Sequence, residues 1–350
     1  MAELLLELYS EEIPPQLQIE ARSQLKQFIE NSFKENHLKY KDLTVYSSPT
    51  RLTLYAKNLS EKIQIDAKEI KGPKVGSPDQ VLQGFIKAKS ISEKDLIEKE
   101  TEKGKFFFIK TQPQVILTEE LLKKIVPKAI GSINWKRSMR WSDYNLMWGR
   151  PLRSIFARFN NNKLLFKFDH LETNDEVIIE QDLIIKTKKI KNFAEYLAFL
   201  KSHEIIVDHE ERKKIILKKI NSVAKSKQYK EHLNPKLLEE VVNIVEDPNL
   251  LLVNFNKEYL KIPQEIIIST LEKNQRYFPI FDSRDRLTNY FFVIANKKDE
   301  KKLITVGNKR VVEARLADAK FFWDKDRSKN LIKQIGNLKS IKKKKKLGTI

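Results

Sequence analysis

Cysteine is absent from this 350-residue chain. Its absence excludes disulfide bonds, thiolate metal sites and a cysteine nucleophile, and it is typical of proteins in a reducing compartment. Glycine is also scarce, with nine residues, and no G-x-G-x-x-G, G-x-S-x-G or H-E-x-x-H motif is present. The segment at 72–78 holds two glycines and two prolines, which predicts a loop and not a phosphate-binding P-loop. The sequence therefore offers no recognisable ATP site.

Long apolar runs are missing as well. No run of 18 or more apolar residues occurs, so the sequence predicts no membrane-spanning helix. The first seven residues carry two glutamates and no basic side chain, unlike the basic start of a signal peptide. We expect a cytoplasmic protein with no membrane partner.

Positive charge is what the chain has in excess. Hydrophobic residues make up 41% and charged residues 33% of the sequence, which is typical of a globular protein, but the net charge is +20. Such a charge attracts polyanions, and nucleic acid is the first candidate partner. Because 53 of the 67 basic residues are lysines, the alternative is that much of the excess lies on solvated helix faces.

Arginine, by contrast, is rare and clustered. Only 14 arginines occur, and five of them lie within 22 residues, among three of the four tryptophans. A guanidinium binds phosphate through two hydrogen bonds and stacks on bases, and mixed basic and aromatic residues are typical of sites for single-stranded or looped RNA. The candidate RNA-binding residues are Arg137, Arg140, Arg150 and Arg153. The alternative is a structural cluster, with Trp141 and Trp148 in a core and the arginines paired with carboxylates such as Asp143.

No metal or cofactor site is predicted in this chain. The five histidines show neither helical i, i+4 spacing nor another strong ligand pattern. The acidic run at 208–211 is a metal candidate, but adjacent residues on a helix point in different directions, so we favour a helix start whose acids complement the helix dipole. Asp318, Asp324 and Asp326 could group around a hard cation. Ion pairs with neighbouring basic residues are the favoured interpretation.

The hydrophobic periodicity predicts an α+β fold with mixed sheets, packed helices and more than one domain. Expected domains are an N-terminal α+β domain at 1–165, a second α+β domain at 166–330, and the start of a truncated helical region at 331–350, which contains five consecutive lysines. Strands are expected at 4–9, within 43–57, at 105–110, within 164–187, at 275–281 and at 290–295. Helices are expected at about 15–33, 79–89, 93–98, 118–130, 192–201, 208–226 and 235–245, with another beginning at Pro263.

The segment at 307–326 predicts an amphipathic helix, with Asn308 as its N-cap. Its apolar stripe is formed by Val312, Leu316, Ala319 and either Phe322 or Trp323. An apolar stripe at helical spacing is more often core than a ligand site, so replacement of Phe322 by alanine is expected to cost roughly 3–5 kcal/mol if the ring is buried. Lys309 and Arg310 are further candidates for nucleic-acid contact.

The same helix is similar to the segment G-N-E-R-V-L-x-A-R-L-x-D-A-x-F-F-x-x-x-D of the beta subunit of bacterial tetrameric glycyl-tRNA synthetase. Other segments resemble that family in the same order along the chain. They are LLELYSEEIPP at 5–15, SPTRL at 48–52, KGP at 71–73, GF at 84–85, SMRW at 138–141, RP at 150–151, VEDP at 245–248, LKIP at 260–263, NQRYFP at 274–279 and Asn296. On these segments the chain is identified as a member of that family.

The resemblance implies a tRNA-binding, non-catalytic subunit that is needed when a complex of two alpha and two beta chains charges tRNA(Gly) with glycine. The alpha subunit would use the ATP and magnesium. The implied partners are therefore the alpha subunit, tRNA(Gly) and, through the tetramer, a second beta chain, and the isolated chain would be inactive. Two alternatives remain open, a general RNA-binding module without its own catalytic role and a self-sufficient enzyme.

The chain departs from the family pattern at several places. The family's G-H-R-F segment is not found between Phe166 and Phe193, where the sequence from Asp169 reads DHLETND, so no role of that segment is carried over. Asn274 stands where the family has a histidine, which excludes a catalytic imidazole at that position. The family also continues into an HD-type helical domain and an anticodon-binding domain. We therefore expect this chain to hold only the N-terminal share of the tRNA contacts.

Overall fold

A computed structural model describes residues 2–65, 69–89, 92–101, 104–110, 113–329 and 332. Within these residues, helices combine with mixed and antiparallel sheets, and the prediction of an α+β fold is confirmed. The expected region at 331–350, with its five lysines, lies outside the described residues apart from Ile332.

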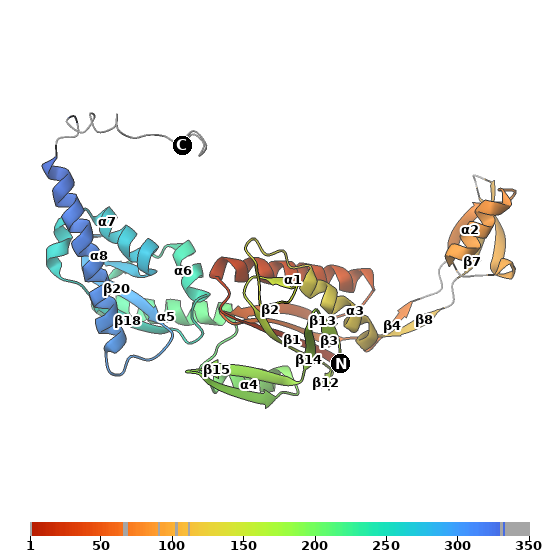
Figure 1. Cartoon of the computed structure of the whole chain (residues 1–350), viewed down its shortest axis with the longest axis horizontal. Coiled ribbons are helices and arrows are strands. Elements are labelled where there is room, and N and C mark those ends of the chain that lie inside the picture. The colour runs from red at the N-terminus through yellow and green to blue at the C-terminus, as the bar shows by residue number, and fades with distance from the viewer. Residues whose placement is uncertain are drawn as a thin grey trace. The chain divides into compact units, whose positions relative to one another are not determined.

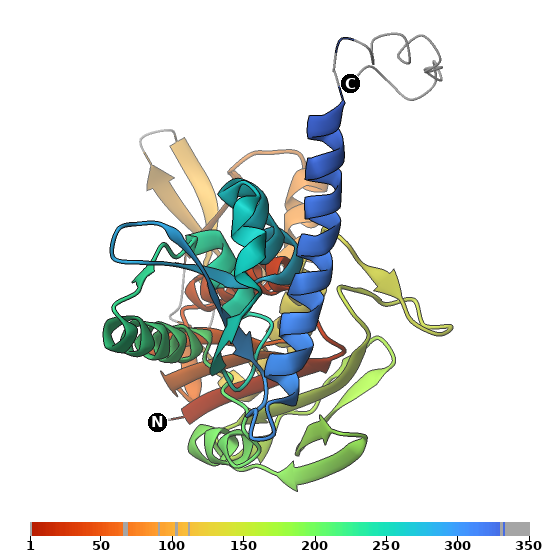
Figure 2. The same ribbon diagram turned by 90° about the vertical axis from the view of Figure 1, so that its left-hand side faces the viewer.

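The chain packs into two compact units (Figures 1 and 2). The first consists of Met1–Tyr9, Glu20–Val45 and Leu52–Tyr196, and the second of Ser10–Ile19, Tyr46–Arg51 and Leu197–Ile350. Each unit is therefore discontinuous in sequence. Compact packing does not show which segments fold on their own, so the expected domain boundaries at 165 and 330 stay predictions.

A seven-stranded sheet forms the centre of the first unit. Its order is β13-β14-β11-β1-β3-β2, with β12 paired to β11. The strands are β1 (Ala2–Ser10), β2 (Asp42–Ser48), β3 (Arg51–Leu59), β11 (Leu152–Phe159), β12 (Asn162–Lys163), β13 (Lys167–Phe168) and β14 (Leu171–Asn174). β11 runs parallel to β14 and antiparallel to β12. Nearly every residue of β1 is buried, as expected for a central strand that is covered on both faces.

Helices α1 (Pro15–Glu35) and α3 (Thr118–Gly131) lie on one side of this sheet (Figure 1). One apolar stripe of α1 is buried. Its members are Leu17, Ala21, Leu25, Ile29 and Phe33. From α4 (Phe193–Lys201), the Tyr196 hydroxyl donates to a carboxylate oxygen of Glu7 on β1 at 2.6 Å and lies 2.8 Å from Thr53 Oγ1 on β3. These contacts satisfy polar groups that the sheet buries.

A small module is inserted between β4 (Lys62–Ile65) and β8 (Gln114–Leu117), which pair antiparallel. It consists of β5 (Glu69–Lys74), α2 (Asp79–Lys89), the 3-10 turn η1 (Glu93–Asp95), β6 (Leu96–Thr101) and β7 (Gly104–Lys110), with sheet order β5-β7-β6. One prediction was wrong here, and another is confirmed in part. The expected helix at 93–98 is one turn followed by a strand. The expected loop is found at 75–78, whereas residues 72–74 still belong to β5. A Cβ on Gly72 would lie 2.8 Å from Cε1 of Phe85, so this glycine lets α2 approach β5.

The second unit has an antiparallel sheet of order β17-β19-β20-β18 with helices on both faces. Its elements are α5 (His209–Lys227), β17 (Lys230–Glu231), α6 (Pro235–Val242), β18 (Asn249–Asn254), the 3-10 turn η2 (Lys257–Lys261), α7 (Gln264–Ser269), the π-helical turn η3 (Thr270–Asn274), β19 (Phe278–Phe281), β20 (Leu287–Ala295) and α8 (Leu303–Ser328). Along β20, Phe292 packs in the cluster with α5 and α6, whereas Phe291 packs in the cluster with α7 and α8. This alternation follows from the two-residue period of a strand.

Helix α8 starts earlier than predicted. Its first turn is capped by Asp299, whose Oδ1 accepts the backbone N–H of Ile304 at 2.9 Å. Asn308 lies inside the helix, where its Nδ2 donates to the Ile304 carbonyl at 2.8 Å and its Oδ1 accepts from the Tyr277 hydroxyl. The prediction of Asn308 as N-cap was therefore wrong, because a carboxylate four residues before Leu303 supplies the cap.

The apolar stripe of α8 is confirmed in part. Val312 and Leu316 are completely buried, and Ala319 and Trp323 pack partly against the same cluster. Of the two residues expected to end the stripe, Phe322 is 59% exposed, so Trp323 is the one that packs. Trp323 lies seven residues after Leu316, two helical turns on, and therefore continues the stripe in its place.

Candidate nucleic-acid interface at an aromatic hairpin

The cluster of arginine and tryptophan lies on a hairpin of the first unit. Strands β9 (Met139–Arg140) and β10 (Met147–Trp148) pair antiparallel. Trp148 is 2% exposed, and its ring centre lies 4.9 Å from that of Trp135. A Cβ on Gly149 would come within 2.5 Å of Cε3 of Trp135, so the chain can pass over this indole only as glycine. One end of the hairpin is thereby fixed.

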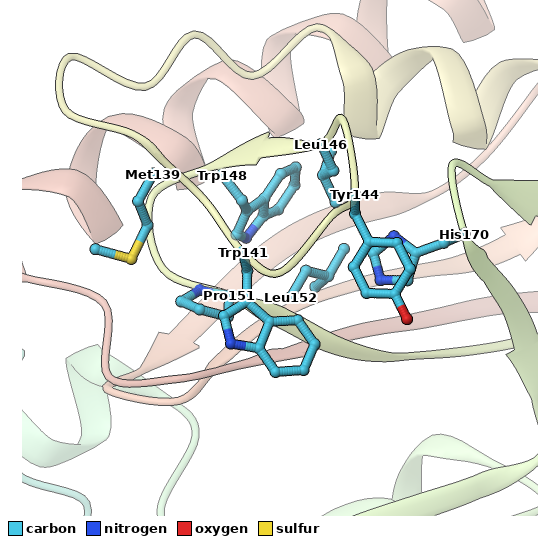
Figure 3. Close-up of a pocket in the computed structure, with 8 residues that line it drawn as sticks. All are labelled: Met139, Trp141, Tyr144, Leu146, Trp148, Pro151, Leu152 and His170. Carbon is cyan, nitrogen blue, oxygen red and sulfur yellow. The ribbon is translucent and has the colours of Figure 1, made fainter.

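The other end of the hairpin presents aromatic rings to solvent (Figure 3). Trp141 is 51% and Tyr144 is 39% exposed. The Tyr144 ring stacks on the His170 imidazole, with 3.6 Å between ring centres and 5° between the ring planes. His170 in turn places Nδ1 2.9 Å from Oδ1 of Asp169. The segment at 169–175, where the family's G-H-R-F motif is not found, thus contacts the hairpin tip.

Two of the candidate arginines have no protein partner among the described residues. Arg137 and Arg140 are exposed, and their side chains form no hydrogen bond or ion pair with any described residue. Arg140 stands next to Trp141 at the end of β9. A guanidinium that is free and next to an exposed ring can bind phosphate or stack on a base.

The other two candidate arginines of the cluster contact protein groups. Arg150 Nη1 donates to the Gly149 carbonyl at 2.9 Å. Arg153 forms an ion pair with Glu180, and its guanidinium carbon lies 5.6 Å from the ring centre of Tyr9. The structural interpretation of the cluster therefore describes Arg150 and Arg153 better than Arg137 and Arg140.

Lys309 and Arg310 lie on α8 and belong to the second unit. Lys309 Nζ is 3.9 Å from a carboxylate oxygen of Glu313, one helical turn further on. Arg310 is exposed. The six candidate residues thus fall in two units, and RNA contact by any of them stays a prediction.

Sequence reasoning missed a polar network in the second unit. Glu246 accepts hydrogen bonds from Ser48 Oγ at 2.6 Å and Thr50 Oγ1 at 3.2 Å, and it lies 3.6 Å from Nη1 of Arg51. The backbone N–H of Glu246 donates to Oδ1 of Asn296 at 2.7 Å. The segments SPTRL and VEDP and residue Asn296, all singled out for the family resemblance, therefore meet in one place. In the sequence, the only indication that these segments belong together was that each resembles the same family.

Asp208 and Asp324, two of the acidic residues considered as metal ligands, have other partners. Oδ1 of Asp208 accepts backbone N–H groups of Glu210 and Glu211 at 2.9 and 3.3 Å, which is an N-cap geometry. Asp324 pairs with Lys320 at 2.5 Å. No group of three or more metal ligands occurs in the described ranges. None of the helices described there combines the length and the apolar character needed to cross a membrane.

Comparison with known proteins gives a consistent set of relatives. The family described as "Glycyl-tRNA synthetase beta subunit" matches residues 4–350. The glycine–tRNA ligase beta subunits of Rickettsia typhi and Rickettsia prowazekii are 34% and 33% identical over 351 residues, and that of Rickettsia felis is 31% identical over 353 residues. Each alignment covers 100% of this chain and 53% of the relative. The chain therefore spans about half the length of the curated relatives it matches.

Proposed function

The chain belongs to the glycyl-tRNA synthetase beta subunit family, and on that premise we propose that it handles tRNA(Gly) for a separate catalytic alpha subunit. The alpha subunit would form the glycyl adenylate from ATP and glycine with magnesium. This chain would bind the tRNA and complete an assembly of two alpha and two beta chains. The observation that carries the proposal is a family match over residues 4–350.

The hairpin at 135–150 supports the tRNA-binding part of the proposal. It carries four basic side chains and one acidic one, and Arg137 and Arg140 have no protein partner among the described residues. The positive field of a chain with net charge +20 would favour encounter with any polyanion. Discrimination of tRNA(Gly) from other RNA would need contacts to bases or to shape, because phosphate contacts carry no sequence information.

Pyrophosphate exchange tests the division of labour. The purified chain, the alpha subunit and their mixture are compared for glycine-dependent exchange and for aminoacylation of tRNA(Gly). We expect no aminoacylation by this chain alone. Glycine-dependent exchange by the isolated chain that survives repurification from the host synthetase would overturn the non-catalytic role and favour the self-sufficient enzyme.

Competition binding tests the RNA preference. Labelled tRNA(Gly) is displaced from the chain with unlabelled tRNA(Gly) or bulk tRNA over a series of salt concentrations. A member of this family is expected to retain some preference for tRNA(Gly) at high salt, where the phosphate contribution is weak. Equal competition by both RNAs at every salt concentration would favour the alternative of a general RNA-binding module.

A further inference from the structure

The tip of the β9–β10 hairpin exposes an unusual amount of apolar surface. Four large side chains within nine residues are exposed, at fractions of 40%, 51%, 39% and 51% respectively. They are Met139, Trp141, Tyr144 and Met147. A cluster of this kind on a soluble protein marks a binding surface more often than a chance exposure.

The charges around these side chains indicate which kind of partner fits. The segment 135–150 contains four basic residues and a single acidic one. Lys136 pairs with Glu20 at 2.5 Å, whereas Arg137 and Arg140 stay unpaired within the described part of the chain. An apolar ring beside free guanidinium groups complements a flat base that is attached to phosphates. It complements a neutral protein face less well, because the two arginines would lose water without gaining a partner.

We propose that the exposed indole of Trp141 stacks with an unpaired nucleobase of the bound RNA, and that Arg137 and Arg140 hold the phosphates on either side of that base. This inference rests on the proposed tRNA-handling function and names the part of the RNA that the hairpin takes. Bases in a duplex are stacked on each other and offer no free face, so the ligand is a single-stranded segment or a loop.

The base stacks on the outside of the hairpin and does not enter it. The cavity below the rings has a volume of about 10 Å³, which is room for one water molecule and not for a base. The rings that line it hold the tip in place, since Tyr144 is stacked on His170 and the ring centre of Trp141 lies 6.0 Å from that of Tyr144 (Figure 3). Rings that already pack against one another before binding lose less conformational entropy when they bind, which favours affinity.

Single-residue variants separate stacking from charge. The probes are tRNA(Gly), a short single-stranded oligoribonucleotide, and the same sequence as a blunt duplex, with affinity measured over a range of salt concentrations. Trp141→Ala is expected to weaken binding of the single strand by on the order of tenfold or more and to leave the salt slope unchanged. Trp141→Phe, which keeps an aromatic face, is expected to restore most of the affinity. Arg137→Ala and Arg140→Ala are each expected to lower the salt slope by about one unit.

Two variants serve as controls in the same unit. Leu165 is 59% exposed and lies outside the hairpin, so Leu165→Ala is expected to leave both affinity and slope unchanged. Lys123 on α3 already pairs with Glu119 and Glu120, so Lys123→Ala removes a positive charge from the same unit without removing a proposed phosphate contact. Melting temperatures of all variants confirm that changes in affinity do not arise from unfolding.

Three results would overturn the inference. The first is a Trp141→Ala variant that binds the single strand as well as the unaltered chain does. The second is an equal loss of affinity for single strand and duplex, which would mean that the surface reads only the backbone. The third is weaker association with the alpha subunit at unchanged RNA affinity, which would make the patch a protein interface. If the unaltered chain binds no RNA at all, both the inference and the proposed tRNA-handling function fail. If the unaltered chain binds RNA and Trp141→Ala binds it equally well, only the inference fails.

Discussion

At the scale of single residues, two glycines show how the surroundings decide the effect of one added methyl group. A Cβ on Gly149 would lie 2.5 Å from a ring carbon of buried Trp135, whereas a Cβ on Gly307, inside α8, meets nothing within 4 Å. We expect Gly149→Ala to lower the free energy of unfolding by about 1–3 kcal/mol, because the packed indole has no room to move. Gly307→Ala is expected to raise it by about 0.5–1 kcal/mol through helix propensity. Urea unfolding of both variants checks this, and effects of the same sign would contradict it.

Burial likewise separates two apolar residues of α8. Leu316 is completely buried, and Phe322 is 59% exposed. We expect Leu316→Ala to cost about 2–5 kcal/mol of unfolding free energy, and Phe322→Ala to cost less than about 1 kcal/mol. Denaturant titration of the two variants gives both values. A large loss for Phe322→Ala would mean that the ring is covered in solution by a surface that the described residues do not provide.

At the scale of elements, the start of α8 depends on one carboxylate. Desolvation alone would raise the pKa of Asp299, but hydrogen bonds from the Thr305 hydroxyl and from the N–H groups of Ile304 and Thr305 outweigh it and lower the pKa. A lowered pKa means that the folded state favours the ionised form. The resulting stability is present above the ordinary carboxyl pKa of about 3.9 and is lost as the pH falls through the folded value.

The matching variant is Asp299→Asn, which keeps an acceptor oxygen and removes the charge. We expect the unaltered chain to be more stable than this variant at pH 6, and the difference to shrink as the pH falls below about 4. Chemical unfolding over this pH range measures it. A difference that does not depend on pH would show that the cap acts only through hydrogen-bond geometry.

Most elements could be predicted from the sequence because their apolar periodicity and their capping residues lie within the elements themselves or directly beside them. Asn234 caps α6 with its side chain, and α2 has the expected bounds of 79–89. One error arises where the backbone leaves regular geometry. Arg276 has a φ of +59° after the π-helical turn Thr270–Asn274, so the strand expected from 275 begins only at Phe278. No side-chain pattern signals a left-handed arginine, which is a costly conformation for a residue with a Cβ.

The sequence predicted which residues belong to the candidate site, but it did not predict which partners their side chains contact. The concentration of arginine among tryptophan located the hairpin, since both residue types are scarce in this chain. Which arginines are free depends on partners elsewhere in the sequence. Arg153 meets the ring of Tyr9 on β1 and Glu180 on β15 (Glu176–Gln181), a strand that pairs antiparallel with β16 (Ile184–Lys189). Neither contact has a local signal.

At the scale of the whole molecule, segments nearly 200 residues apart build the second unit together. Ser48 and Glu246 are separated by 198 positions and are joined by a hydrogen bond of 2.6 Å. Gln18 extends the connection, because its Nε2 donates at 2.7 Å to the carbonyl oxygens of both Ile13 and Asn243. The unit therefore cannot form from one continuous stretch of chain, which is why a linear division of the sequence does not describe its packing.

Glu246 is the residue through which this long-range connection is best tested. Its side chain is 15% exposed, that of Arg51 is 2% exposed, and the two lie 3.6 Å apart. We expect Glu246→Ala to lower the free energy of unfolding by roughly 3 kcal/mol, because it removes a buried ion-pair partner and the acceptor of two hydroxyl groups. Glu246→Gln keeps an acceptor for Ser48 and Thr50 and is expected to lose less.

The ion pair between Glu204 and Lys298 provides the matched comparison. It belongs to the same unit and has a shorter N···O distance of 2.9 Å, but its side chains are 57% and 62% exposed. Solvent screens such a pair, so Glu204→Ala is expected to change stability far less than Glu246→Ala. Denaturant unfolding of the three variants at one salt concentration gives the ranking Glu246→Ala, then Glu246→Gln, then Glu204→Ala in order of decreasing loss. Equal losses for the two alanine variants would mean that the 48–51 segment is held in place by its other contacts and that Glu246 does not join the distant parts of the unit.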